Sequence, residues 1–178
     1  MVVKAVKFLF YILFFCVALY YFFPKVNAYY AFEKSLEKEN IIISNENLID
    51  HGFSLEIKDA IIFYHAIKVA DVKKISLYSY LFVSKIDIKD IVLQKMADGY
   101  IPPKIESCEI SYSLLSPLEL KAQAQGDFGK ATIFYSLKTK KLLVLLEPSK
   151  VMLHTYAKTL AQMKKEKGKY KYETVINF

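Results

Sequence analysis

A continuous run of apolar and aromatic side chains, FLFYILFFCVALYYFF, fills residues 8–23. Lys4 and Lys7 precede the run, and Pro24 ends it. Together with the valines and the alanine of residues 2–6, it approaches the ~20 residues that span a bilayer core. The pattern predicts a membrane-spanning helix, with these anchoring residues: Phe8, Leu9, Phe10, Ile12, Leu13, Phe14, Phe15, Leu19, Phe22 and Phe23.

Two interpretations of this segment stay open. In the first, residues 1–25 are an uncleaved signal anchor, with the lysines on the cytoplasmic side and the aromatic residues 20–23 as a belt on the far side. In the second, a secretory signal is removed after Ala28, since Val26-Asn27-Ala28 fits the small-residue cleavage pattern. We favour the anchor, because the run is long for a signal peptide and ends in four bulky aromatic residues. Either way, we expect the inner membrane as the partner and the bulk of the chain in the periplasm; the anchor would be single-pass.

From residue 40 onward the chain alternates apolar and polar positions. Leu55 and Ile57, for example, flank Glu56. A period of two is typical of strands with one buried and one solvated face. It recurs near residues 53–58, 74–79, 85–89, 108–114, 118–124, 131–137 and 142–146, and short turns between these segments predict an antiparallel meander. Tyr100-Ile101-Pro102-Pro103 predicts a rigid crossover between two groups of strands.

Two stretches have helical periodicity instead. Residues 29–38 place apolar side chains on one face and predict a stalk over residues 26–39. Residues 149–167 predict an amphipathic helix with Ser149 as N-cap, followed by a closing strand over residues 169–178. The predicted fold is α+β and mainly β: a transmembrane helix (1–25), the stalk (26–39), and an exported domain (40–178). That domain is a curved sheet or half-barrel groove with one C-terminal amphipathic helix and a final strand.

The net charge of +7 lies at the two ends of the chain. Residues 1–25 carry +3, residues 26–140 carry −1, and residues 141–178 carry +5. All 25 basic residues are lysine, and base readout in DNA depends on the arginine fork, so we expect no nucleic-acid partner. A lysine cluster at residues 164–169 suggests either contact with anionic lipid or a solvated helix end. The lysines of this cluster are Lys164, Lys165, Lys167 and Lys169.

Motifs for catalysis, cofactors or metals are missing from the sequence. None of the five glycines has the spacing of a phosphate-binding loop, and neither G-x-S-x-G nor C-x-x-C occurs. His51, His65 and His154 are isolated in sequence, and we predict no metal site and no cofactor. Cys16 and Cys108 are not expected to form a disulfide, and Cys108 is predicted to be inert. We therefore predict a protein that is not an enzyme.

The chain has more aromatic and aliphatic surface than a small one-layer sheet can easily hide, with 14 Tyr and 13 Phe. One interpretation is a sheet whose apolar face is covered by the helix of residues 149–167. The other is a curved sheet with a partly open groove that takes lipid acyl chains or a strand of a partner protein.

Several motifs resemble those of AsmA-like envelope proteins and of the type II secretion pathway protein N family. The strand Leu55-Glu56-Ile57-Lys58-Asp59 leads through residues 67–70 to an I-x-I-x-x-I-x-L pattern at residues 86–93. Residues 101–105 resemble the Pro-Pro crossover of the secretion N family. Residues 126–131 and 142–148 resemble its G-x-x-G hairpin and the strand that follows, and residues 168–173 resemble its closing G-x-Y-x-Y-E strand. The chain is shorter than typical members and lacks their arginines. The resemblance implies an inner-membrane anchor with a periplasmic β-groove, used in envelope assembly, secretion or lipid handling, and it implies no catalytic residues.

The leading hypothesis is a membrane-anchored periplasmic protein without enzymatic activity, either a secretion-system accessory or scaffold or a lipid-groove protein. Lipid acyl chains or other envelope proteins are its expected partners. A small outer-membrane β-barrel is the alternative, because apolar residues alternate up to the terminal Phe178. An exported enzyme of unknown type is the third hypothesis, and it needs a polar cluster that the sequence does not show.

Overall fold

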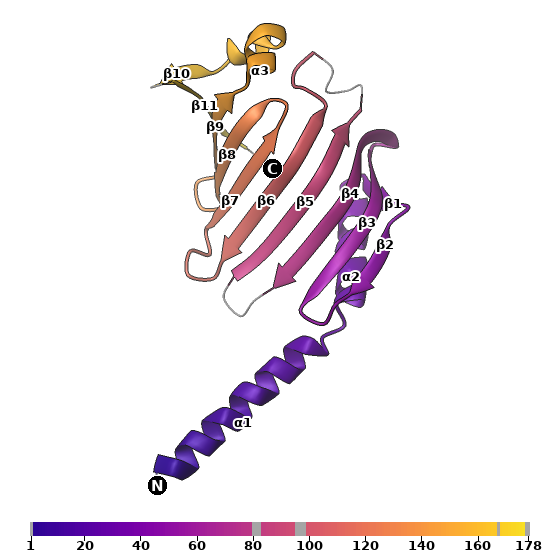
Figure 1. The fold of residues 1–178 in the computed structure, drawn as a ribbon, viewed down its shortest axis with the longest axis vertical. Coiled ribbons are helices and arrows are strands. Elements are labelled where there is room, and N and C mark those ends of the chain that lie inside the picture. Colours follow the sequence, from indigo (N-terminus) through magenta and orange to yellow (C-terminus); the bar gives the residue numbers. More distant parts are fainter. Residues whose placement is uncertain (1, 80–82, 95–98, 167, 177–178) are drawn as a thin grey trace.

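The computed structural model describes residues 2–79, 83–94, 99–166 and 168–176, and nearly all the strands in these ranges follow one antiparallel meander (Figure 1). The described strands form a single sheet in the order β1-β3-β4-β5-β6-β7-β8-β9-β11-β10, with β2 also paired to β3. The bounds of the strands are β1 (Ile41–Ser44), β2 (Asn47–Asp50), β3 (Ser54–Tyr64), β4 (Ile67–Ser79), β5 (Val83–Leu93), β6 (Lys104–Ser113), β7 (Glu119–Gly126), β8 (Gly129–Ser136), β9 (Lys141–Pro148), β10 (Lys164–Glu166) and β11 (Lys169–Val175).

Four helices accompany the sheet in the described ranges: α1 (Val2–Tyr21), α2 (Lys25–Lys38), α3 (Lys150–Thr155) and α4 (Ala157–Leu160). Figure 1 shows α1 projecting away from the sheet, and its large side chains from Phe8 to Phe15 are all exposed. By length and hydropathy, none of the described helices qualifies alone as a membrane span, whereas Val6–Tyr21 and Lys25–Lys38, bent by 56°, qualify only when taken together.

The edge of the sheet next to α2 is built from two short strands. β1 and β2 pair with successive parts of β3: Ser44 lies opposite Ile61, and Asn47 lies opposite Lys58. Between them, Asn45 adopts a left-handed backbone (φ 63°), and so does Asp59 in β3 (φ 55°). Asparagine and aspartate tolerate this region better than other residues with a Cβ, so the edge bends here without a glycine.

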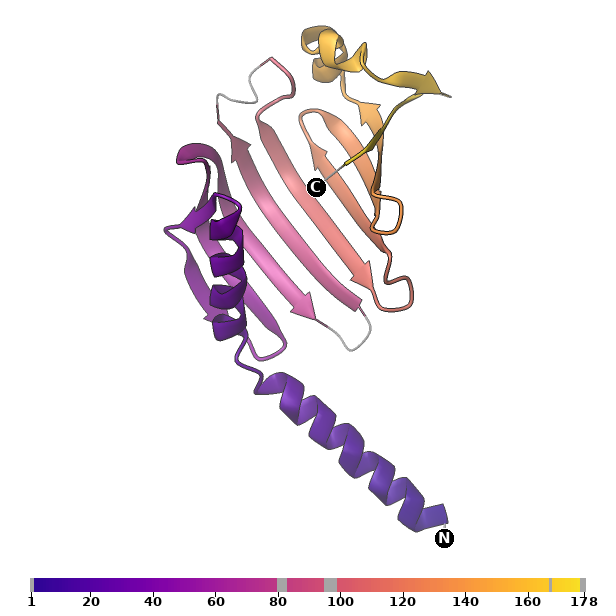
Figure 2. The same ribbon diagram turned by 180° about the vertical axis from the view of Figure 1, so that it is seen from behind.

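Two hydrophobic clusters lie on the same face of the sheet, one at each end. Figure 2 looks onto this face and shows α2 lying along one end of it. Tyr29 of α2 is buried there with Leu55, Ile57 and Val72. At the other end, Phe128 and Leu146 pack with Met152 of α3 and Leu160 of α4. No described helix lies over β5–β7 on this face (Figure 2).

The predicted mainly β fold is confirmed at the level of an antiparallel sheet with helices at its N-terminal side, but three details of the prediction are wrong. The segment 26–39 is helical, yet it is not a free stalk, because Tyr29 is 5% exposed and packs against the sheet. The Pro102-Pro103 segment does not separate two groups of strands: β5 and β6 are direct neighbours, and buried Pro102 belongs to the loop that joins them.

The third correction concerns the predicted helix over residues 149–167. Ser149 does cap a helix, and its hydroxyl accepts the N–H of Met152 at 3.1 Å. The helix ends at Thr155, a short turn of helix follows, and Lys164–Glu166 is a strand. Lys164 pairs with Lys171 and Lys165 with Tyr170 in a hairpin with β11, so the β10–β11 backbone hydrogen bonds replace the last turns of the predicted helix.

Candidate functional site

The most extensive functional surface candidate is the apolar face of the sheet. Strand registers place one apolar residue from each of eight successive strands in a single line, which we call the groove row. Its members, from β3 to β11, are Leu55, Leu77, Ile86, Ile110, Ala122, Ile133, Val144 and Tyr172. Neighbouring strands lie about 4.8 Å apart, so the groove row is about 34 Å long.

A second line runs beside the groove row and is also apolar. It consists of Ile57, Ile75, Ile88, Cys108, Ala124, Ala131, Leu146 and Tyr170. Because side chains of one strand alternate between faces, both lines lie on the face that α2, α3 and α4 cover at its ends. The sequence predicted this face correctly for most of these strands.

A hollow of about 540 Å³ lies between α2 and the β3–β5 part of the groove row. Leu55, Leu77 and Ile86 form its floor, and Tyr29 and Phe32 of α2 form one wall. Tyr20 and Phe23, from the end of α1 and the connection to α2, also line it. The hollow therefore joins the groove row to the end of the exposed helix α1.

A second hollow, of about 370 Å³, lies at the opposite end of the same face. Ile133, Val144 and Tyr172 of the groove row line it together with Met152 and Met163. Ile110 and Ala122 are the groove-row residues between the two hollows, and both are half-buried. The arrangement is one apolar strip with a hollow at each end and a shallower middle.

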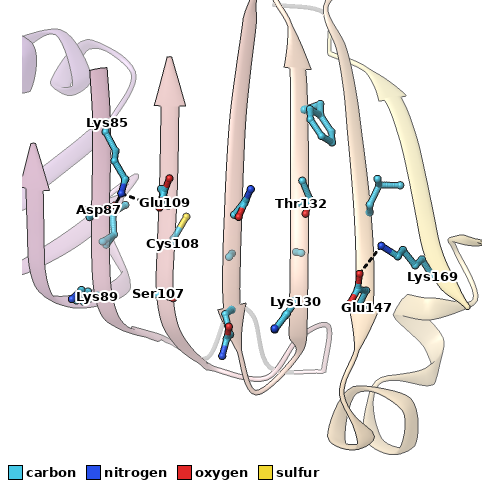
Figure 3. A pocket seen from close by; sticks show the side chains of 17 residues that line it. Lys85, Asp87, Lys89, Ser107, Cys108, Glu109, Lys130, Thr132, Glu147 and Lys169 are labelled. Atoms are coloured by element: carbon cyan, nitrogen blue, oxygen red, sulfur yellow. Dashed lines mark ion pairs between the residues drawn. The ribbon is translucent and has the colours of Figure 1, made fainter. Parts of the chain in front are cut away.

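The opposite face is largely polar and carries its charges as ion pairs. Lys85 Nζ lies 3.0 Å from Glu109 and 3.3 Å from Asp87, and Lys169 Nζ lies 2.6 Å from Glu147 (Figure 3). These contacts raise the pKa of Lys85 and lower the pKa of Glu147. A polar hollow of about 520 Å³ crosses this face. The ion-paired residues named above line it, whereas Lys89 and Lys130, which also line it, form no ion pair with the described part of the chain.

The end of α1 is fixed to the sheet by a set of polar contacts. The Tyr20 hydroxyl donates to the carbonyl of Phe53 at 2.9 Å and accepts the N–H of Ser79 at 3.2 Å. Lys25 Nζ donates to the carbonyls of Tyr20, Tyr21 and Phe23 at 3.2–3.3 Å, where the α1 dipole favours a cation. Gly52 is required opposite Tyr21, because a Cβ there would overlap the tyrosine ring.

Under α2, an acidic pair faces the buried Tyr29. The Tyr29 hydroxyl makes no hydrogen bond to any described residue, and its pKa is raised by burial and by the charges of Glu46 and Glu33. The pKa of Glu33 is raised by burial and by Glu46, to which it is hydrogen-bonded. The raised pKa of Glu33 predicts that the contact between α2 and the β1–β2 connection weakens when Glu33 loses its proton.

The predicted site residues lie far apart in the structure. The predicted anchoring residues Phe8–Phe10 and Ile12–Phe15 are exposed on α1, as are Leu19, Phe22 and Phe23 at its end. Lys164 and Lys165 are exposed on β10, at the end of the sheet away from α1, and Lys169 is paired with Glu147 (Figure 1). Lys167 lies outside the described residues. Whether this lysine cluster contacts lipid stays a prediction.

The cysteines and histidines are dispersed as well. Cys108 lies in the second apolar line, and burial raises the pKa of its thiol. His51 Nε2 lies 3.5 Å from Glu56, while His65 and His154 lie on other elements. Among the described residues there is no group of three or more His, Cys, Asp or Glu side chains that could hold a metal ion.

Sequence reasoning missed Tyr20, Tyr29 and Phe128 as residues that shape the candidate site. Tyr20 was assigned only to an aromatic belt and Tyr29 only to a stalk, because the amphipathic pattern does not reveal which surface a helix packs on.

No protein-family model matches the chain, and neither a curated protein nor a solved structure does.

Proposed function

We propose that the chain is a membrane-anchored envelope protein without enzymatic activity, and that its apolar face binds the acyl chains of lipids. The observation that carries this proposal is the groove row, eight apolar side chains in line with hollows at both ends. Leu55 is buried and Tyr172 is exposed, but the other six residues of the row are only half-buried. A soluble protein of this size gains nothing from leaving them so, since each apolar Å² in water costs about 25 cal/mol.

The exposed surface of α1 supports membrane anchoring. Among the described helices α1 does not qualify as a span by itself, but its 20 residues give it a length of about 30 Å, close to the thickness of a bilayer core. Lys4 and Lys7 lie at one end and Tyr20 and Tyr21 at the other, as the positive-inside bias and the aromatic belt require. In the proposal, the sheet lies on the periplasmic side of the inner membrane.

The dimensions of the groove row fit acyl chains. One leaflet of a bilayer core is about 15 Å thick, and this is the length that one acyl chain spans. The groove row, at about 34 Å, therefore has room for about two chains end to end. Its two hollows, of about 540 and 370 Å³, are in the usual size range of small-molecule sites.

The position of the larger hollow suggests how lipid reaches the row. Tyr20 and Phe23 line this hollow, and both follow directly on the membrane-spanning part of α1 in the proposal. An acyl chain that leaves the bilayer beside α1 thus meets apolar surface without crossing a polar segment. The lipid-handling role implied by the resemblance to AsmA-like proteins agrees with this arrangement.

The test is bound phospholipid in protein extracted from membranes in mild detergent, measured by native mass spectrometry. Ala122→Phe fills the middle of the groove row, whereas Gln123→Phe adds the same ring to the polar face of the same strand. We expect phospholipid on the wild-type protein and on Gln123→Phe, and most of it lost in Ala122→Phe. Absence of lipid from all three proteins, or equal lipid on both variants, contradicts the proposal.

A further inference from the structure

We propose that the end of the sheet next to α1 is a second membrane contact, which inserts into the same leaflet surface from which α1 emerges. The contact is made by four exposed leucines in the β6–β7 and β8–β9 connections, which we call the leucine rim: Leu114, Leu115, Leu118 and Leu137. This inference rests on the proposed function, because it takes α1 to be the membrane anchor.

The position of the leucine rim is the first argument. Strands β4, β6 and β8 end, and β5, β7 and β9 begin, at the end of the sheet where α1 leaves, and α1 runs in roughly the direction of these strands (Figures 1 and 2). The two hydrogen bonds of the Tyr20 hydroxyl, to Phe53 before β3 and to Ser79 at the end of β4, attach α1 to this end. A bilayer that surrounds α1 therefore lies next to these connections.

The exposure of the leucines is the second argument. Leu115 is 83% exposed, and the other three are between 44% and 55% exposed. Hairpin connections in water normally carry polar residues, whereas Ser113–Glu119 reads SLLSPLE. Leucine side chains at a bilayer surface bury their apolar area among acyl chains, which water does not allow.

The leucine rim is also held in a fixed shape. The Leu115 N–H donates to Ser113 Oγ at 3.2 Å, and the N–H of Ser116 donates to the Ser113 carbonyl at 3.1 Å. The N–H of Leu137 donates to the carbonyl of Leu118 at 2.8 Å, which ties the β8–β9 connection to the β6–β7 connection. The two connections that carry the four leucines are thus tied together, and insertion requires little ordering of their backbone.

The charges around the leucine rim match an anionic surface. Residues 113–119 and 136–141 contain three lysines, Lys138, Lys140 and Lys141, against one acid, Glu119. Lys141 is paired with Glu173 at 3.3 Å, while Lys138 and Lys140 are exposed and form no ion pair with the part of the chain that the structure describes. Free lysines beside exposed leucines are typical of segments that dock on anionic lipid headgroups.

The leucine rim continues the apolar face to the membrane. Tyr112, Leu120 and Tyr135 form the cross-strand line between the rim and the groove row, and all three are half-buried on the apolar face. If the rim docks on the leaflet, the groove row runs along the membrane surface. Lipid could then reach the row along its length as well as through the hollow beside α1.

The absence of tryptophan from the chain gives a direct test. Three single-tryptophan variants of the full chain are reconstituted in vesicles of phosphatidylethanolamine and phosphatidylglycerol with brominated acyl chains, which quench tryptophan inside the bilayer. Leu115→Trp reports the rim. Tyr100→Trp, 64% exposed at the opposite end of the sheet, is the matched control. Phe14→Trp reports insertion of α1.

We expect strong quenching for Phe14→Trp and Leu115→Trp and little for Tyr100→Trp. In a Lys138→Glu, Lys140→Glu background, quenching of Leu115→Trp is expected to fall by at least half, with Phe14→Trp unchanged. Quenching of Phe14→Trp without quenching of Leu115→Trp overturns this inference and leaves the membrane anchor intact. Loss of quenching at Phe14→Trp overturns the membrane anchor itself.

Discussion

Ser79, at the end of β4, donates its backbone N–H to the hydroxyl of Tyr20, 59 residues earlier in the chain, at 3.2 Å. The same hydroxyl donates to the carbonyl of Phe53 at 2.9 Å. One phenol thus bridges the end of α1, the start of β3 and the end of β4. The direction in which α1 leaves the sheet is fixed by these contacts and by Lys25, which lies 3.8 Å from Asp50.

Removal of the Tyr20 hydroxyl is expected to loosen this junction. Tyr20→Phe loses two hydrogen bonds but keeps the ring stacked on Phe53, at 5.8 Å between centroids. We expect a loss of about 1 kcal/mol in the free energy of unfolding and faster hydrogen exchange at the Ser79 amide. Tyr30→Phe, on the exposed side of α2, is the control. Unchanged exchange at Ser79 in Tyr20→Phe would show that the bridge does not hold the junction.

Gly129 is expected to be the least replaceable glycine. Its φ of 110° is strained for other residues, and a Cβ there would overlap the Glu147 carbonyl and lie 2.7 Å from the Ser149 nitrogen. We expect Gly129→Ala to lower the free energy of unfolding by about 3 kcal/mol. Gly168 also has a positive φ, but a Cβ there would lie in open space, so we expect Gly168→Ala to lower the free energy of unfolding by only about 1 kcal/mol. Chemical denaturation measures both, and equal losses would contradict the predicted overlap.

The contact between α2 and the sheet is expected to weaken as pH rises. The pKa of Glu33 in the folded protein is raised above its ordinary value of 4.5 by burial and by Glu46. Its protonated form is therefore favoured by folding, and this contribution is full below pH 4.5 and lost as pH rises through the raised pKa. Glu33→Gln keeps a neutral group at all pH values, so it should stabilise the protein at neutral pH and flatten the pH profile.

The effect of Glu33→Gln is measured by chemical denaturation at several pH values. Glu39→Gln, at the exposed end of α2, is the control variant. Parallel profiles for the wild type and Glu33→Gln would show that the acidic pair is not coupled to folding.

Glu56 is expected to behave in the opposite way. Hydrogen bonds from Lys74 and Lys58 lower its pKa from 4.5 to about 2. A lowered pKa stabilises the fold above pH 4.5, and the contribution is lost as pH falls toward 2. Lys74→Gln removes the hydrogen bond that contributes most to the lowered pKa of Glu56. We therefore expect acid unfolding of the sheet, followed by circular dichroism, to occur at higher pH in this variant. Lys73→Gln, its exposed neighbour, should not change the transition; if both variants move equally, the Lys74–Glu56 contact at 2.7 Å is not the cause.

The alternation of the sequence was sufficient to predict the faces of the central strands. Ile86, Ile88 and Ile110 lie on the apolar face because a period of two leaves only one way to bury them. The pairing of β1 with β3 was not predictable, since Ile41-Ile42-Ile43 shows no alternation and its partner, residues 61–64, is also continuously apolar. Tertiary contacts decided this edge.

The helix at residues 149–167 was misjudged for a related reason. Met152 and Leu160 are buried in one cluster, so the predicted apolar face of this segment is correct. The segment 164–166 contains good helix formers, but its hairpin with β11 supplies backbone hydrogen bonds that an exposed helix end lacks. The leucine rim was missed because nothing in the sequence shows that the connections around residues 115 and 137 lie beside α1.

The most direct test of lipid binding on the apolar face uses a phospholipid with a photoreactive group in its acyl chain. The full-length protein is crosslinked in membranes, and the modified residues are mapped by mass spectrometry. We predict adducts on groove-row residues such as Ile86, Ile110 and Ala122, in addition to α1, and their loss in Ala122→Phe. Adducts confined to α1, or spread equally over the polar face at Gln123 and Lys130, would contradict the account.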